Sequence, residues 1–510
     1  MLTALIGLLI PLWLFYKFYV SIYNYWESRG IAAEPGRFPF GNNLRFITMK
    51  DSSTPLINQM YKKHESQPYF GFYMLRSPLL VVKDPEIIRL VLAKDFIHFR
   101  NRFPESALSS KEDKLQHHLF NLGGEKWRPL RIKLTPTFTS GKLKAMFPLF
   151  IACAEDLSNM LLGQIDKPVN VKDITACYTT DTVCSCVFGW ENNSINEKEN
   201  EMRKLGQKIL SIPKFVLIKR FVRIIFPPIA RLLQLRIVSR EIEDSLIKMV
   251  GDTIAYREAN DVKRNDFLDL LIQLKNKGSV EDDVKKNGID TNVEPVEMNL
   301  GMLTAQCFVF FIAGFETSSS VQSYCLYELA LNPDVQRKLR EEIHSTINKH
   351  GGITYQAIQE MEYLDMVVSE TMRMYPTLPA LNRSCTKDYT TPAGHKIKKG
   401  DNIIIPIWSL QRDSKYFPDP KKFDPERFSP KNKDKIKPFT YMPFGDGPRN
   451  CIGSRFGLLQ TKVGIITILK NYEVHKTEET QIPLKFRGST VIAMTKGPIT
   501  LKFSPKPSAL

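Results

Sequence analysis

One cysteine lies in a segment whose composition suits a rigidly held sulfur atom. The segment 444–457 reads FGDGPRNCIGSRFG, with Cys451 near its middle. Gly445 and Gly447 permit positive φ angles and therefore a tight loop before the cysteine. We expect a helix to begin at Cys451, and its free N–H groups, together with Arg449, would favour the thiolate over the thiol. The pattern indicates a thiolate that can serve as a metal ligand.

The residues after this cysteine leave space for a flat group. Gly453 and Gly457 are one helical turn apart and would present a stripe without side chains. Phe444, which precedes Cys451 in the same segment, would shield the sulfur from water and oxidation. A soft thiolate in a dry loop beside such a stripe suits axial ligation of a metal.

A second chemical motif lies inside a long apolar segment, where residues 313–317 read AGFET. Gly314 would leave room for a diatomic ligand, because it has no side chain. Glu316 and Thr317 supply an acid and a hydroxyl that could pass protons inward. The motif therefore predicts a proton path within a helix.

A mainly helical body must position these residues. The pattern of residues 69–82 predicts a β-hairpin, and residues 389–406 read as extended segments. Since helix outweighs strand and no Pro/Ser-rich linker divides the body, we expect one mainly α domain with small β-sheets. Helices are predicted at 84–93, 142–162, 200–210, 238–260, 266–275, 297–331, 333–349, 354–374 and 457–472.

The amino-terminal residues 1–22 form an apolar run long enough to span a bilayer. Positive residues follow the run, which predicts that the body lies on the cytosolic side of the membrane. We therefore predict a transmembrane signal anchor at 1–22, a Pro/Gly-rich hinge at 23–42 and a catalytic domain at 43–510. The alternative is a cleaved leader on a secreted protein.

Charge and cysteine content narrow the classes of protein. The chain has 71 Lys and Arg against 54 Asp and Glu, a net charge of +17, which favours an anionic partner. No nucleic-acid-binding motif accompanies this charge, so no nucleic acid is expected as a partner. The basic amphipathic stretch 212–235 suits a lipid membrane surface. Eight cysteines without a C-x-x-C pair indicate reduced, mostly buried thiols.

The cysteine segment resembles the haem-binding signature of the cytochrome P450 superfamily, F-G-x-G-x-R-x-C-x-G, and agrees with it at every fixed position. By this resemblance Cys451 is the axial ligand of the iron of haem b. The AGFET motif is similar to the family's oxygen-binding pattern, which implies catalytic roles for Thr317 and Glu316. The signature also implies that Phe444, Gly445 and Gly453 belong to the cofactor site.

Further motifs extend the resemblance along the chain. Glu370-Thr-Met-Arg373 resembles the family's E-x-x-R, and Pro425-Glu-Arg427-Phe resembles P-E-R-F. They imply a structural role for Glu370, Arg373 and Arg427, because side chains at i and i+3 can pair on one helix face. The resemblance implies that the anionic haem propionates are bound by Trp127, Arg131, Arg383 and Arg449.

The resemblance implies a P450-type helical domain that performs haem-thiolate monooxygenation. It would insert one oxygen atom from O₂ into lipophilic molecules such as xenobiotics, plant toxins, insecticides, or endogenous lipids and hormones. The passages 127–144 and 308–320 look most like insect detoxification enzymes of family six, and are similar to vertebrate family-three drug oxidases. Family position implies substrate contacts, besides Thr317, at Phe120, Phe308, Ala313, Leu378, Leu381 and Val491.

Electrons must come from another protein, because no G-x-G-x-x-G dinucleotide motif follows a strand in this sequence. The resemblance implies a separate NADPH-dependent reductase, with cytochrome b5 as a second donor. Two alternatives remain: a non-catalytic haem-binding membrane carrier or sensor, and a haem-thiolate isomerase or dehydratase. Candidate docking charges for the acidic donors are Lys126, Arg128, Lys133, Lys142 and Lys144.

Overall fold

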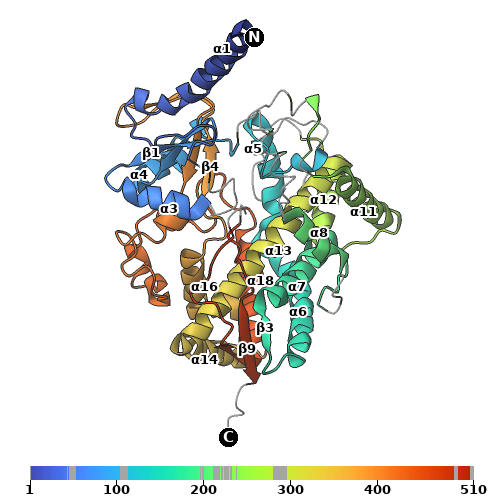
Figure 1. The fold of residues 1–510 in the computed structure, drawn as a ribbon. Helices are drawn as coiled ribbons and strands as arrows, with labels where there is room; N and C mark the ends of the chain where they lie inside the picture. The colour runs from blue at the N-terminus through green and yellow to red at the C-terminus, as the bar shows by residue number, and fades with distance from the viewer. Residues whose placement is uncertain are drawn as a thin grey trace.

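Helix α13 (Leu300–Leu331) lies at the centre of the molecule, and α7 (Val171–Val183), α16 (Glu362–Met374) and α18 (Ser454–Asn471) pack against it (Figure 1). Most of its side chains are buried, as expected of a helix surrounded by other helices. Asn299 caps its first turn by accepting the Met302 N–H at 3.0 Å. The computed structural model describes residues 2–42, 44, 53–103, 113–195, 197, 200–210, 219, 222, 229, 232–236, 238–278, 296–487 and 492–505.

Gly314 fixes how closely two of these helices approach. A Cβ atom at this position would lie 2.8 Å from Cγ2 of Val183 on α7. Such a contact is shorter than side chains tolerate, so the glycine is required by helix packing. The missing side chain therefore accommodates α7 rather than a diatomic ligand.

The remaining helices surround this central group. The predicted ranges agree with the observed ones to within a few residues, apart from residues 354–374 and several shorter helices that the sequence pattern missed. The other helices are α1 (Leu2–Val20), α3 (Ser53–Lys63), α4 (Pro85–Arg89), α5 (Gly124–Leu134), α6 (Ser140–Leu162), α8 (Glu201–Leu210), α11 (Arg240–Ala259), α12 (Phe267–Lys277), α14 (Pro333–His350), α15 (Tyr355–Glu360) and α17 (Ile407–Leu410).

The prediction of one continuous helix over residues 354–374 was wrong. The chain leaves the helical conformation at Met361, where ψ is 86°, and α16 begins at the next residue. The carboxylate of Glu342, on α14, accepts the N–H groups of Tyr363 and Leu364 at 2.7 and 2.9 Å. A side chain from another helix thus satisfies the first donors of α16, which a local pattern does not reveal.

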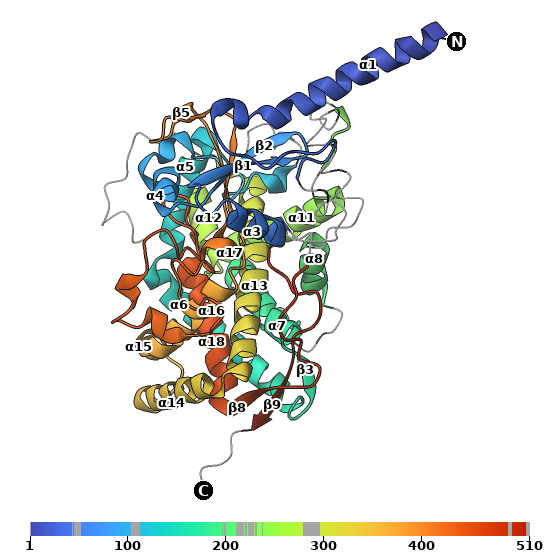
Figure 2. The same ribbon diagram turned by 60° about the vertical axis from the view of Figure 1, so that its left-hand side comes forward.

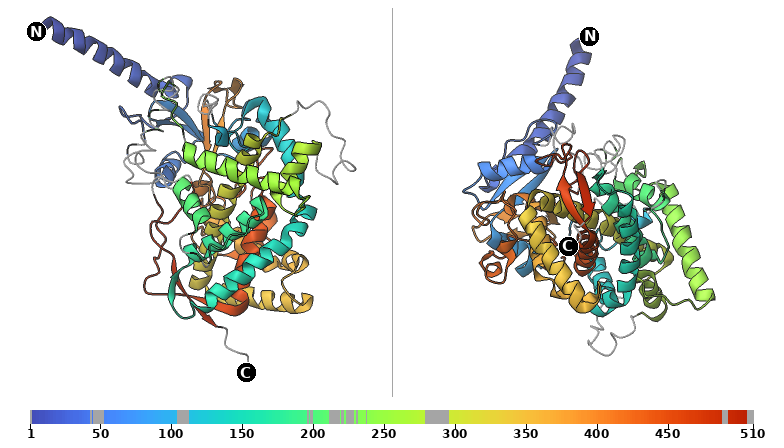
Figure 3. Two further views of the ribbon diagram at one scale, coloured as in Figure 1. Left: turned by 90° about the vertical axis from the view of Figure 1, so that its right-hand side faces the viewer. Right: turned by 90° about the horizontal axis from the view of Figure 1, so that it is seen from below.

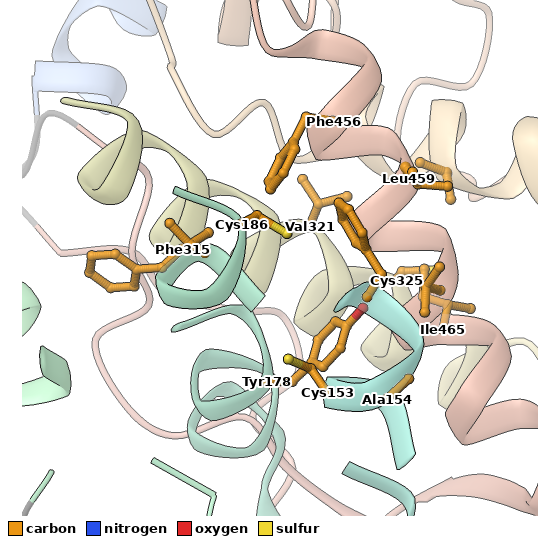
Figure 4. Packing of buried hydrophobic residues seen from close by; sticks show 14 of the residues in the cluster. Cys153, Ala154, Tyr178, Cys186, Phe315, Val321, Cys325, Phe456, Leu459 and Ile465 are labelled. Carbon is orange, nitrogen blue, oxygen red and sulfur yellow. The ribbon is translucent and has the colours of Figure 1, made fainter. Parts of the chain in front are cut away.

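The hydrophobic core contains most of the cysteines, as predicted. Seven of the eight are buried, and Figure 4 shows Cys153, Cys186 and Cys325 among Tyr178 and other apolar side chains. Burial raises the pKa of the Cys153 and Cys325 thiols to about 12, so they remain protonated and unreactive. Cys451 is the exposed member of the eight.

Two small sheets lie at opposite ends of the molecule, one near α1 and the other near the C-terminus (Figure 2). The predicted hairpin is confirmed, and β1 pairs antiparallel with β2 from Tyr69↔Val82 to Met74↔Ser77. The first sheet has the order β1 (Tyr69–Met74), β2 (Ser77–Val82), β7 (Asn402–Ile405), β4 (Leu381–Ser384). The second has the order β3 (Pro168–Asn170), β9 (Thr500–Pro505), β8 (Tyr472–Lys476), and a separate pair is formed by β5 (Tyr389–Thr390) and β6 (Lys396–Ile397).

The segment predicted as a hinge at 23–42 packs along the edge of the first sheet. Trp26 is fully buried, and Gly71 on β1 allows its approach, since a Cβ there would lie 2.4 Å from the indole. The segment also pairs with β1 through backbone hydrogen bonds: Gly71 donates to Ala32, and Glu34 donates to Gly71. The segment therefore covers an edge that would otherwise expose unpaired backbone groups.

The same region fixes the end of α1, which projects away from the body in both views of Figure 3. Arg76, in the turn of the hairpin, stacks on the Phe18 ring at 3.7 Å and donates to its carbonyl at 3.2 Å. Tyr19 donates its hydroxyl to the Pro39 carbonyl at 2.5 Å. Large apolar side chains from Leu9 to Phe18 are exposed. Within the described residues, α6 and α13 also have the length and composition of membrane spans, but both contribute to the core of the body.

Replacing Trp26 with alanine is expected to lower the free energy of unfolding by about 3–5 kcal/mol, because it leaves a cavity under the edge segment. Thermal unfolding of detergent-solubilised protein measures the change. The matched control is Trp13→Ala, since Trp13 is 57% exposed and its loss should change stability by less than about 0.5 kcal/mol. Equal effects of the two substitutions would contradict the packing role of Trp26.

Candidate active site

The loop that carries Cys451 is closed by its own backbone. The Cys451 N–H donates to the Phe444 carbonyl at 2.8 Å, and the Asn450 N–H donates to the Gly447 carbonyl at 3.0 Å. Gly445 and Gly447 have φ angles of +69° and +70°, which confirms the predicted positive φ at both glycines. Gly447 has a second constraint, because a Cβ there would lie 1.9 Å from the Leu92 carbonyl oxygen.

The thiol of Cys451 is accessible to solvent yet partly surrounded by protein atoms. Burial raises its pKa, and this effect is opposed by the Gly453 N–H and by the positive charges of Arg102 and Arg131. Helix α18 begins at Ser454, three residues after the cysteine and not at it. Arg449 was expected to favour the thiolate, but its guanidinium donates to the Leu122 carbonyl at 2.5 Å instead. A metal cation bound to the sulfur would favour the thiolate.

The glycine stripe after Cys451 faces Phe138 and the central helix. At Gly453 the atom nearest to an added Cβ is on Phe138, at 3.8 Å, and at Gly457 it is Ser318 Oγ, at 3.7 Å. Ser318 follows Thr317 on α13, so α18 approaches α13 beside the second chemical motif. The two motifs, far apart in the sequence, therefore lie on neighbouring helices.

Glu316 and Thr317 lie on different sides of α13. The Thr317 hydroxyl donates to the Ala313 carbonyl at 2.6 Å, and Ala313 is exposed although its helix runs through the core. Glu316 is 4% exposed and forms an ion pair with Lys172 of α7 at 2.9 Å. Burial lowers the pKa of Lys172, and the nearby Glu316 carboxylate opposes that shift.

A buried cluster of arginines lies beside the Cys451 loop. Arg449 is 2% exposed and its guanidinium lies 4.4 Å from the centre of the Trp127 ring. Arg383, on β4, is equally buried and donates to the Asn382 carbonyl at 2.8 Å. Arg131 donates to the carbonyl and side-chain oxygens of Asn450, both at 2.9 Å. The predicted propionate-binding residues are thus brought together from α5, β4 and the cysteine loop.

Arg102 completes the cluster and was not predicted from the sequence. It donates to the carbonyls of Phe120 at 3.2 Å and Arg449 at 2.8 Å. It lies outside any motif, and a charged residue in the irregular segment before α5 gives no sequence signal of its role. Only the long-range contact with Arg449 reveals it.

The charges of this cluster are not balanced by a described carboxylate. Burial, with repulsion from Arg102, Arg383 and Arg131, lowers the pKa of Arg449 to about 8. Burial, with repulsion from Arg102, lowers the pKa of Arg383 to about 9. Among the described residues, Nε and Nη1 of Arg449 and Nε of Arg383 have no hydrogen-bond partner. Two carboxylates on a bound group would supply the missing acceptors, and haem has two propionates.

Glu370 and Arg373, the residues of the predicted E-x-x-R motif, form an ion pair in the interior. Arg373 Nε donates to Glu370 Oε2 at 2.7 Å, and both side chains are fully buried. Arg427 Nε lies 3.4 Å from Glu370 Oε1. Arg373 also donates to the Gln411 and Pro420 carbonyls at 2.8 and 3.0 Å, tying α16 to the segment before the cysteine loop.

The residues predicted to contact substrate are only partly brought together. Phe120 lies under the Arg102 guanidinium, 4.1 Å from it, and Phe308 packs in a small cluster with Leu115 and Ile242. Leu378 and Leu381 are half-buried near the first sheet, and Ala313 is exposed in the middle of α13. Val491 lies outside the described residues, as does most of the basic stretch 212–235.

A mainly helical fold around an accessible cysteine and a buried arginine cluster defines a haem-thiolate protein. Comparisons agree, because the Cytochrome P450 family model matches residues 33–503. The chain is 39% identical over 492 residues to Cytochrome P450 6a2 of Drosophila melanogaster, covering 94% of this chain and 95% of that protein. It is 40% identical over 497 residues to Cytochrome P450 6k1 of Blattella germanica, covering 95% and 94%.

The chain therefore belongs to the cytochrome P450 family and is similar to insect members of family six. It is a P450 monooxygenase, and its cofactor is haem bound through a cysteine thiolate. This membership argues against the carrier and isomerase alternatives left open by the sequence.

Replacing Arg373 with methionine should lower the free energy of unfolding by about 3–5 kcal/mol, because it leaves the buried Glu370 charge without a partner. Denaturant titration measures this change. Arg89→Met is the matched control, since Arg89 pairs with Glu86 at the same i, i+3 spacing but on the surface, at 3.0 Å. Its loss should cost less than about 1 kcal/mol, and a comparable loss in both variants would contradict the role of burial.

Replacing Arg449 with glutamine should speed haem loss by about tenfold, since one charge-assisted hydrogen bond to a propionate disappears. Transfer of haem to excess apomyoglobin, followed by the Soret band, measures the rate. Arg455→Gln is the control, because Arg455 is exposed and bonds to Ser140 at 3.3 Å. Identical rates in the two variants would exclude Arg449 from the haem site.

Proposed function

We propose that this enzyme oxygenates lipophilic small molecules, xenobiotics or endogenous lipids, with electrons from NADPH delivered by a separate reductase. The observation that carries the proposal is the set of buried guanidinium groups without described anionic partners, which lies beside the accessible Cys451. Such a cluster suits the two propionates of haem, and membership of the cytochrome P450 family favours an oxygenase over a haem-binding carrier.

In this proposal Cys451 would hold the haem iron through its thiolate, and Trp127, Arg131, Arg383, Arg449 and Arg102 would bind the propionates. The Phe444 carbonyl holds the Cys451 backbone, while the positive φ angles of Gly445 and Gly447 shape the loop. The Gly453 N–H lies close enough to the sulfur to stabilise its negative charge. When bound, the haem supplies oxygen activation with electron density from the thiolate.

Thr317 is the proposed proton donor of the site. Its hydroxyl donates to the Ala313 carbonyl, and each of its two lone pairs can still accept a hydrogen bond from water. Glu316 would supply protons to this hydroxyl, but its carboxylate is paired with Lys172. The proton path therefore requires Glu316 to separate from Lys172, which sets a barrier between solvent and the Thr317 hydroxyl.

Substrate would lie near the exposed Ala313, between α13 and the loop that carries Phe120. The proposed contacts (Phe120, Phe308, Ala313, Leu378, Leu381 and Val491) are apolar, which favours lipophilic ligands. No charged side chain belongs to this set. We infer that orientation of the substrate depends on shape more than on ion pairing.

The reductase is proposed to dock on the outer side of α5. This helix directs Trp127 and Arg131 toward the cysteine loop, while Lys126 and Arg128 are exposed. Lys144, at the start of α6, is exposed as well. Lys133 is a weaker candidate, because it donates to the Val296 carbonyl at 3.0 Å. An acidic surface of the reductase, or of cytochrome b5 as second donor, would complement these charges.

We further propose that α1 anchors the enzyme in the endoplasmic reticulum membrane, with the body on the cytosolic side. The exposed apolar side chains from Leu9 to Phe18 support this assignment, because water would not stabilise such a helix surface. Positive residues that follow α1, such as Arg29 and Arg37, favour a cytosolic body.

Replacing Thr317 with alanine should reduce the ratio of oxygenated product to NADPH consumed by at least about tenfold, with release of hydrogen peroxide, because the proton donor is lost. The assay uses holoenzyme with reductase, after the reduced CO spectrum has verified the thiolate ligand. Thr304→Ala is the matched control, since Thr304 makes the same hydrogen bond on α13, to Leu300 at 2.8 Å. Unchanged coupling in Thr317→Ala would refute the assigned role.

A further inference from the structure

The loop of residues 117–122 is held at both ends by side chains from other elements. We propose that Gln306, on α13, is a positioning residue for substrate binding, which holds this loop in the conformation that presents Phe120 to the pocket. The inference rests on the proposed function in one respect, namely that Phe120 lines the substrate site.

Gln306 makes the first attachment with both polar atoms of its side-chain amide, Oε1 and Nε2. Its Oε1 accepts the Leu119 N–H at 3.0 Å, and its Nε2 donates to the His117 carbonyl at 3.4 Å and to the Met302 carbonyl at 3.2 Å. The side chain is fully buried. A buried amide and two buried backbone groups would be costly to leave unpaired, so the loop has a strong preference for this register.

The second attachment is the arginine cluster of the haem site. Arg102 donates to the Phe120 carbonyl at 3.2 Å, and Arg449 donates to the Leu122 carbonyl at 2.5 Å. Between the attachments the loop forms a tight turn, because the N–H groups of Asn121 and Leu122 both donate to the His118 carbonyl at 3.0 Å. Six consecutive residues are thus suspended between α13 and the residues proposed to bind propionate.

The side chains of this loop form an aromatic row. The His118 ring lies 6.3 Å from Phe308 on α13 and 6.4 Å from Phe120. The Phe120 ring also lies 6.2 Å from Phe103 and 4.1 Å from the Arg102 guanidinium. Burial, with repulsion from Arg102, lowers the pKa of His118 to about 3, so the row is uncharged up to Arg102. Displacing the Leu119 backbone would shift both His118 and Phe120, since they flank it in the turn.

Gln306 acts through this loop and not on the reacting atoms. It precedes Thr317 by eleven residues on the same helix, an axial distance of about 16 Å. A substitution there should consequently alter how ligands that reach the loop are bound, while ligands that contact only the iron should bind as before.

Gln336 offers a matched control elsewhere in the fold. It is also a buried glutamine that attaches a backbone segment: it donates to the Leu329 and Val474 carbonyls at 3.1 and 2.9 Å and accepts the Val474 N–H at 2.7 Å. It joins α14 to β8, at the end of the molecule opposite the first sheet (Figure 2). Gln336→Met removes a similar set of hydrogen bonds without touching the loop.

The test compares Gln306→Met with Gln336→Met in the haem-loaded protein, using imidazole and 4-phenylimidazole as probes in difference spectra. We expect Gln306→Met to weaken 4-phenylimidazole by about five- to tenfold and imidazole by less than about twofold, since only the phenyl ring reaches the loop. Gln336→Met should leave both affinities unchanged. Gln306→Asn, which keeps the amide on a shorter side chain, should give an intermediate loss.

Hydrogen–deuterium exchange supplies a readout that is independent of ligand binding. The amide of Leu119 should exchange faster in Gln306→Met than in the wild type, and equally in Gln336→Met and the wild type. Faster exchange with unchanged 4-phenylimidazole affinity would overturn the proposal, as would equal weakening of both probes. Imidazole binding by the wild type tests the haem site separately, so failure of that assignment is distinguished from failure of the role of Gln306.

Discussion

Repulsion among four guanidinium groups, of which those of Arg383 and Arg449 are buried, is the constraint on which the rest of the structure depends. Arg102, Arg131, Arg383 and Arg449 come from separate elements and converge beside one thiol. Without a bound anion, each element would bring a desolvated positive charge close to the other guanidinium groups. The haem is therefore part of the interior in an energetic sense, because its propionates make it favourable for these elements to meet.

Helix α13 connects this charged region to the rest of the fold by using its sides differently. Ser318 lies beside Gly457 of α18, and Glu316 joins α13 to α7 through Lys172. Near its start, Gln306 holds the loop between α13 and the arginines. One rigid helix thus carries the proposed proton path, the attachment of the loop and the packing against α7. The positions of these three features relative to one another are therefore fixed.

Sequence reasoning predicted those features whose causes are local. The glycines of the cysteine loop predict positive φ angles, because glycine adopts them more readily than other residues. Glu370 and Arg373 are partners because of their spacing on one helix. It did not predict Arg102, the break at Met361 or the packing of residues 23–42. Each depends on a partner distant in the sequence: Arg449, Glu342 and the edge of β1. Such partners leave no signal in a single sequence. The ion pair between Glu316 and Lys172 was not predicted for the same reason.

The packing of Trp26 and Arg76 restricts how the amino-terminal helix can move relative to the body. The chain between α1 and the first sheet makes contacts with the body at several points. These contacts hold α1 at a fixed angle to the body. For an enzyme embedded through α1, rotation about the linker would be suppressed, and the surface around α5 would keep one inclination toward the bilayer. A membrane-bound electron donor would then search fewer orientations before each productive encounter.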